Sequence, residues 1–320
     1  MVHDVTLREI EEARERVRKN VVRTPLVRLN SDAPSEIYLK LECLQPTGSF
    51  KVRGAGNAIA QLTSNEREKG VYTCSAGNMA QALAWHAKRE GLACTVIVPD
   101  TAPRTKLDAI RRYGADIIQM SYDEVWKVGN ERKYAPLADR TFIHPYADPR
   151  MIAGNGTIGL EIFEDLPDVD AVIVPFGGGG LFTGIASAVK AKKNSVRMFA
   201  SEVITAAPLS QSLAAGRPME IKRIPSFVDG IGGGNVAEDI WTLAKPLLTS
   251  SIVVELAEVT VAIKLLLERH RVVAEGAGAS SLAAALTGKA GKGKTVCVIS
   301  GGNIDISNLN TILEGKVPSL

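Results

Sequence analysis

Short apolar runs alternate with helical patterns along most of this 320-residue chain. The runs at 71–74, 93–98 and 171–174 lack the regular polar–apolar alternation of a strand with one wet face. Strands of this kind are covered on both faces, as in parallel sheets, and helices between successive strands are typical of βαβ units. The sequence therefore predicts an α/β fold of two doubly wound domains with parallel sheets.

The strand-like runs fall into two series, with boundaries near residues 48 and 145. We expect residues 1–47 to join the later series, which gives a large domain of residues 1–47 plus 146–320 and a small domain of residues 48–145. The Gly- and Pro-rich stretch 217–235 reads as a long loop, and loops of that length often line a site.

Composition excludes several classes of protein. The net charge of +3 and the 5% aromatic content provide no surface for nucleic acid or for an anionic membrane. Residues 1–9 are charged and no apolar run reaches membrane-spanning length, so a cytoplasmic protein is expected. The four cysteines and four histidines are dispersed, which favours buried free thiols and no metal site.

Lys51 stands just inside the start of an expected helix. A strand at 36–42 precedes it, Pro46 and Gly48 interrupt the chain, and Ser49 could cap a helix that begins near Phe50. A helix N-terminus disfavours an ammonium by ~0.3–1 kcal/mol, which lowers the lysine pKa. The free amine is the form that attacks carbonyl compounds, so Lys51 is a candidate for Schiff-base chemistry. The alternative interpretation is that Lys51 is an ordinary solvated surface lysine.

A second feature is a loop of four glycines, Gly177–Gly180, between an apolar strand and a helical run. Four successive glycines cost backbone entropy, but they let amide groups close around an anion at a helix N-terminus, and phosphate is the expected anion. A dinucleotide site with Glu202 on the ribose is the competing interpretation. No frame through these glycines gives G-x-G-x-x-G, which weakens that alternative.

Two further turns follow strand ends, where parallel sheets bind ligands. The turn at 75–79 offers Ser75, Asn78 and amide groups to a carboxylate or phenolate, or it simply caps a helix. The turn at 300–303 offers the Ser300 hydroxyl to a ring nitrogen, or to the next helix as a cap.

Residues 288–295 match the P-loop pattern formally, but they lead from an expected helix into a strand, so we do not expect a P-loop there.

A lysine at a helix start, an anion cradle and two polar turns together suit a phosphorylated carbonyl cofactor, pyridoxal phosphate. Residues 46–55, Pro-Thr-Gly-Ser-Phe-Lys-Val-Arg-Gly-Ala, resemble the cofactor-lysine motif of the fold-type-II pyridoxal-phosphate enzymes, in the threonine/serine dehydratase and serine racemase branch. The resemblance covers nearly the whole chain. It implies a large cofactor-binding domain and a small domain that closes on the substrate.

The resemblance also implies a role for each matching residue. Lys51 would form the Schiff base, Phe50 would pack beside the cofactor, and Glu275 would lie near the ring. Asn78 would bind the phenolic oxygen, Ser300 would face the pyridine nitrogen, and Ser75, Asn78 and the Met79 amide would hold the substrate carboxylate. The phosphate would lie in the cradle formed by Gly177, Gly178, Gly179, Gly180 and Leu181.

Three residues depart from the family pattern. Ala76 replaces the serine that serves racemases as a base opposite the lysine, and Met79 replaces a histidine. Pro208 stands where cation-binding members carry an aspartate that acts with a glutamate like Glu202, so no metal is expected. Because the sequence ends near Leu320, the carboxyl-terminal regulatory domain of biosynthetic threonine dehydratases is not expected.

The expected function is α,β-elimination on L-threonine or L-serine, a lyase reaction that releases a 2-oxo acid and ammonia. The alternatives are a serine or other amino-acid racemase, a dehydratase of another 3-hydroxy amino acid such as hydroxyaspartate or phenylserine, and, from another class, a nucleotide-binding regulatory protein. The resemblance further implies a homodimer or a higher homo-oligomer.

Overall fold

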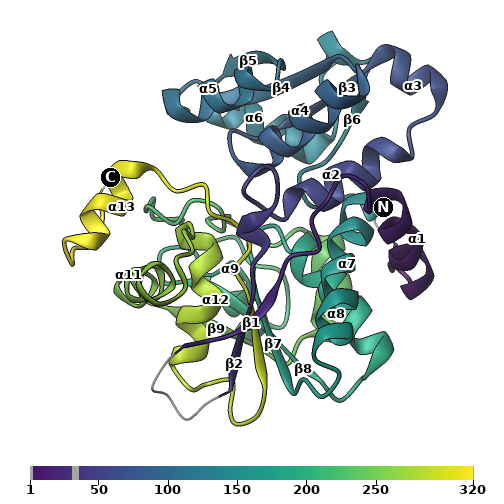
Figure 1. The fold of residues 1–320 in the computed structure, drawn as a ribbon. Helices are drawn as coiled ribbons and strands as arrows, with labels where there is room; N and C mark the ends of the chain where they lie inside the picture. The colour runs from purple at the N-terminus through teal and green to yellow at the C-terminus, as the bar shows by residue number, and fades with distance from the viewer. Residues whose placement is uncertain (1–2, 31–35, 320) are drawn as a thin grey trace.

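The computed structural model describes residues 3–30 and 36–319. Its strands form two separate sheets, one above the other in Figure 1. The larger sheet has the order β1-β2-β10-β7-β8-β9 and the smaller has the order β5-β4-β3-β6. This arrangement confirms the α/β fold class, and the exact residue boundaries of two domains stay a prediction.

The larger sheet is parallel except at one edge, where β1 pairs antiparallel with β2. The short extended segment after Pro25 forms that edge, which the expectation of purely parallel sheets missed. Its strands are β1 Leu26–Arg28, β2 Ile37–Lys40, β10 Thr295–Val298, β7 Ala171–Pro175, β8 Arg197–Val203 and β9 Ser250–Val254.

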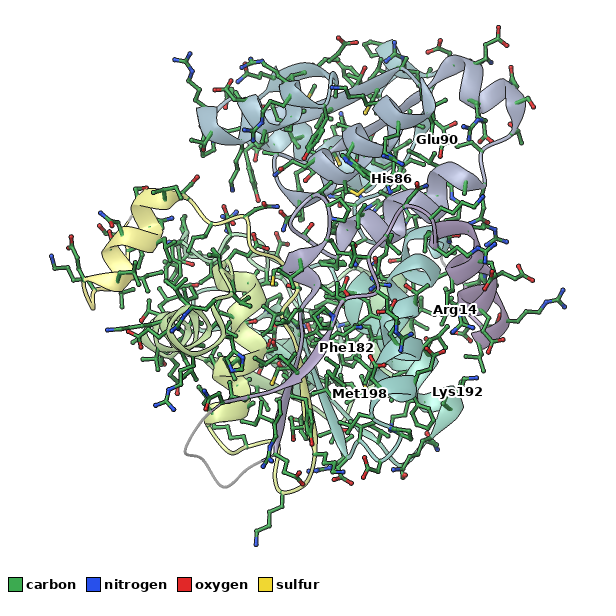
Figure 2. All side chains as sticks on the ribbon, viewed as in Figure 1. Arg14, His86, Glu90, Phe182, Lys192 and Met198 are labelled. Atoms are coloured by element: carbon green, nitrogen blue, oxygen red, sulfur yellow. The ribbon has the colours of Figure 1, made fainter. Side chains whose placement is uncertain are left out.

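Two apolar cores cover the larger sheet, one on each face. Phe182 and Met198, labelled in Figure 2, belong to the core formed with α1 Leu7–Val17, α7 Pro149–Asp165, α8 Gly180–Lys192 and α10 Glu238–Ala244. The other core is formed with α11 Leu256–Leu265 and α12 Gly276–Leu286, and α13 Ile306–Leu313 packs against it. Burial on both faces explains the continuous apolar runs in the sequence.

The smaller sheet is entirely parallel and carries its own cores. The sequence patterns did not predict α3, α6 or β6, which are short or charged. The elements are β3 Val71–Cys74, β4 Cys94–Pro99, β5 Asp116–Met120, β6 Thr141–Phe142, α3 Ser64–Lys69, α4 Asn78–Glu90, α5 Arg104–Arg112 and α6 Tyr122–Glu131.

One helix, α2 Lys51–Ala60, lies between the two sheets (Figure 1). It packs against α7 of the larger unit and α4 of the smaller one. His86, labelled in Figure 2, bonds from α4 to the Val52 carbonyl at 2.8 Å. The helix that carries Lys51 is therefore the joint between the two halves of the molecule.

Several loops also follow the expectations. The segment between α9 Pro208–Ala215 and α10 contains no helix or strand, and residues 288–294 lead from α12 into β10 as a helix-to-strand loop.

The four cysteines are free thiols. Within the part of the chain that the structure describes, every helix is too short or too polar to cross a membrane.

Because β7 is buried on both faces, we predict that Ile173→Ala lowers the free energy of unfolding by about 2–5 kcal/mol. Ile204→Ala is the control, because Ile204 is 53% exposed and the same truncation there should cost less than ~0.5 kcal/mol. Urea unfolding followed by tryptophan fluorescence measures both. Equal losses in the two variants would contradict the position of β7 in the core.

Candidate active site

The start of α2 is fixed to the end of β10. The Phe50 amide donates to the Ser300 carbonyl at 2.9 Å, and Ser49 forms an isolated bridge with Gly301. A strand end at the centre of a parallel sheet is where such folds bind ligands. Two of the sequence-predicted residues, Lys51 and Ser300, are thus brought to one place by the backbone.

Lys51 is the first residue of α2 and its side chain is half-buried. Its Nζ donates to the Pro145 carbonyl and lies 5.1 Å from the centre of the Phe50 ring. Burial lowers the pKa of the Lys51 amine to about 8. The expected direction is confirmed, but its cause is loss of water around the amine rather than the helix terminus.

The expectation that Ser49 caps this helix is wrong. Phe50 occupies the N-cap position without a side-chain bond, and the Ser49 hydroxyl is buried with no hydrogen-bond partner among the described residues. Gly48, at φ +70, turns the chain just before it. The bridge to Gly301 fixes the helix start in place of a cap.

Tyr146 is a residue that sequence reasoning missed, and it connects the neighbourhood of Lys51 to the glycine loop. Its ring packs so closely on Gly178 that a Cβ there would lie 2.1 Å from the ring. At Gly180 a Cβ would lie 2.3 Å from the Tyr146 carbonyl oxygen. Because the Pro145 carbonyl accepts a hydrogen bond from the Lys51 amine, residues 145–146 place the amine beside the loop.

His144 is a second residue that sequence reasoning missed. Its Nδ1 accepts hydrogen bonds from the amides of Tyr146, at 3.2 Å, and Ala147, at 2.9 Å. Burial lowers its pKa to about 4, and the positive charges of Arg132 and Lys51 act in the same direction. The imidazole is therefore neutral at physiological pH, with its proton on Nε2.

The glycine loop follows β7 and ends at Gly180, the first residue of α8. Gly179 has φ +82, a conformation that glycine adopts at little cost. Within the described ranges, the amide groups of residues 177–181 donate to no protein acceptor. Unused donors at the N-terminus of a 13-residue helix form an anion site, so the loop fits a phosphate.

A second set of donors lies in the turn after β3. The Ser75 hydroxyl accepts from the Gly77 amide at 3.2 Å, and α4 begins at Asn78. The amides of Asn78 and the buried Met79 have no acceptor among the residues the structure describes. This turn can therefore hold a carboxylate.

Asn78 joins this turn to the larger sheet. Its Nδ2 donates to Glu275 Oε1 at 2.7 Å, and its Oδ1 accepts from Asn303 Nδ2 at 2.7 Å. Burial, with the negative charge of Asp229, raises the pKa of Glu275 to about 7. Glu275 in turn donates its amide to the Gly301 carbonyl at 3.0 Å, next to Ser300.

The Ser300 side chain is buried and has no hydrogen bond within the described part of the chain. Residues 145–146 thus connect Lys51 to the glycine loop. Phe50, Asn78 and Glu275 are connected to the turn at 300–303. Among the residues that the structure describes, the Ser75 hydroxyl hydrogen-bonds only within its own turn.

The Glu202 carboxylate already accepts three hydrogen bonds from the chain. The donors are the amides of Leu209 and Ser210, each at 2.8 Å, and the Ser251 hydroxyl at 2.7 Å. Pro208 opens the helix that these bonds hold. A ribose would have to displace three internal bonds, so the dinucleotide interpretation has no support from this geometry.

The model of the pyridoxal-phosphate dependent enzyme family matches residues 17–302. This chain belongs to that family. It is 42% identical to an L-threonine ammonia-lyase of Thermotoga maritima, over 98% of this chain and 80% of the relative. It is 37% identical to a catabolic L-threonine dehydratase of Escherichia coli K12, over 96% of each. The structure of maize serine racemase matches with a TM-score of 0.88 and 34% identity, over 98% of each chain.

The residues present fit the family's cofactor. The loop before α8 offers unused amide donors to a phosphate, the Ser300 hydroxyl is free for a ring nitrogen, and the Lys51 amine has a lowered pKa. At pH 7 about a tenth of such an amine is the free base, against roughly one in three thousand at its ordinary pKa. The site is therefore suited to an aldehyde that carries a phosphate.

We predict that Gly178→Ala raises the dissociation constant of pyridoxal phosphate at least about tenfold, equivalent to ~1.4 kcal/mol, because the added methyl displaces Tyr146. Gly233→Ala is the control, since a Cβ there has the Asn235 carbonyl as its nearest neighbour at 3.7 Å. Fluorescence titration of the apoprotein measures both. Unchanged affinity in Gly178→Ala would separate the loop from the cofactor.

Proposed function

We propose that this protein is an ammonia-lyase that converts L-threonine, and L-serine, into a 2-oxo acid and ammonia. The main support is the position of the Lys51 amine, which residues 145–146 place near the glycine loop before α8, whose amides have no protein acceptor among the described residues. Relatives at 42% and 37% identity are named L-threonine ammonia-lyase and L-threonine dehydratase.

Bound pyridoxal phosphate supplies an electron sink for the substrate α-carbon. The amides of residues 177–181 would hold its phosphate, Ser300 would bind its ring nitrogen, and Asn78 would bind its phenolic oxygen. Phe50 would pack beside it, and Glu275 fixes the Asn78 side chain. The chain thus binds the group through backbone donors and neutral side chains.

The substrate carboxylate binds in the turn before α4, at Ser75, Asn78 and the Met79 amide. Lys51 Nζ then removes the α-proton, and the Pro145 carbonyl orients that amine. Loss of the β-hydroxyl with a proton gives water, and hydrolysis of the unsaturated amine gives the 2-oxo acid and ammonia. The neutral Ser300 partner favours prompt elimination over a long-lived carbanion.

Racemisation is the second candidate, because a serine racemase has a similar structure. Ala76 argues against it. The half-buried methyl group of Ala76 stands in the turn that holds the substrate and cannot donate or accept a proton. Lys51 is then the base on one face of the α-carbon, and Ala76 supplies none on the other. A homodimer or higher homo-oligomer stays a prediction.

We predict that Lys51→Ala abolishes both the visible absorption of the cofactor-loaded protein and ammonia release from L-threonine, because it removes the reactive amine. Lys69→Ala, at an exposed position in α3, should leave both unchanged. Absorption spectra and a coupled ammonia assay measure the two effects. Full turnover by Lys51→Ala would reject the assignment.

We predict that Ala76→Ser raises the ratio of racemisation to elimination, because the new hydroxyl supplies a proton on the second face. Ala138→Ser adds the same hydroxyl at an exposed position and serves as the control. Chiral chromatography of serine, with pyruvate measured in the same sample, gives the ratio. An unchanged ratio would refute the reading of Ala76.

A further inference from the structure

Four charged side chains lie buried together behind the Lys51 helix. They are Lys40, Glu42, Arg53 and Glu161, and each is at most 5% exposed. Isolated buried charges are costly, so such a cluster survives only when its members are paired and hydrogen-bonded. The proposed reaction uses none of them.

Arg53 is the centre of the cluster. Its Nε and Nη2 donate to the two carboxylate oxygens of Glu42, both at 2.8 Å. Its Nη1 and Nη2 donate to the two oxygens of Glu161 at 2.7 and 2.9 Å. Both edges of the guanidinium are thus held in two-bond contacts, a geometry that lysine cannot reproduce.

Lys40 completes the charge balance. Its Nζ donates to Glu161 Oε2 at 2.5 Å and to the Thr24 carbonyl at 2.6 Å. Thr24 also donates its hydroxyl to Glu42 at 2.5 Å. Two cations and two carboxylates therefore form one neutral unit.

The cluster joins α2 to the parts of the larger unit that surround the site. Lys40 ends β2, Glu42 follows in a short 3-10 turn, and Glu161 lies in α7. The Cys43 amide donates to the Ile299 carbonyl at 2.9 Å, directly before Ser300. Lys51 and Arg53 are two positions apart, about 200° around the helix, so Arg53 can be held while Lys51 faces the site.

We infer that Arg53 is a positioning residue, which fixes the start of α2 on the larger unit and so holds the Lys51 amine against Pro145 and the glycine loop. The helix packs on both halves of the molecule, and it meets the smaller half at α4, through His86. The cluster ties it to the half that carries the loop. The inference rests on the proposed role of Lys51.

The test variant is Arg53→Lys, which keeps the charge and loses the two-bond contacts. If α2 shifts, water reaches the Lys51 amine and its lowered pKa rises from about 8 toward its ordinary value. The charge of Lys51 helps to lower the pKa of His144, which stays neutral above about pH 4 and does not complicate the profile. The pH midpoint of cofactor association with the apoprotein should therefore move upward.

We predict that Arg53→Lys shifts this midpoint by at least about half a pH unit and lowers kcat about tenfold or more, with KM changed less than threefold. Ile263→Ala, a buried truncation in α11, is the control for lost stability. It should lower the unfolding temperature and leave the midpoint and kcat of folded protein unchanged.

A wild-type midpoint and wild-type kcat in folded Arg53→Lys would overturn the inference. Should that variant not fold, Glu42→Asp keeps the charge and shortens the arm, and the same two outcomes apply to it. Comparison of wild-type with Lys51→Ala in the same association assay tests the role of Lys51 separately, so failure of the proposed function is distinguishable from failure of this inference.

Discussion

The hydrogen bond from the Phe50 amide to the Ser300 carbonyl is the contact on which the site depends. It fixes the start of a helix to the end of a strand at the centre of the larger sheet. The lysine one residue later donates to the Pro145 carbonyl, and the next residue, Tyr146, packs on the glycine loop. Burial removes water from the amine, and this loss of hydration makes the amine nucleophilic near neutral pH.

In the proposed function, the two helix N-termini divide the binding of anions. The unused amides of the loop before α8 would hold the phosphate, and those of the turn before α4 would hold a carboxylate. Backbone donors of this kind are rigid and need no charged side chain. Neither proposed anion site therefore depends on the charge of Lys51.

Much of this could be predicted from the sequence, because it depends on local patterns. Continuous apolar runs identified the buried strands, and the four glycines correctly predicted a loop between β7 and α8, whose role as a phosphate cradle stays a prediction. Tyr146 and His144 could not be predicted, since their roles depend on contacts with Gly178 and Lys51, each more than 30 positions away. The prediction that Ser49 caps α2 was wrong because a long-range bridge to Gly301 replaces a local bond. The antiparallel edge strand β1 was missed because the direction of strand pairing is not a local property.

The most direct test of the central claim is to load the protein with pyridoxal phosphate, reduce it with borohydride, and locate the modified residue by peptide mass mapping. The proposed mechanism predicts a stable pyridoxyl adduct on Lys51, which is the enclosed amine with a lowered pKa. An adduct on another lysine, or no adduct in protein that retains ammonia release, would contradict it.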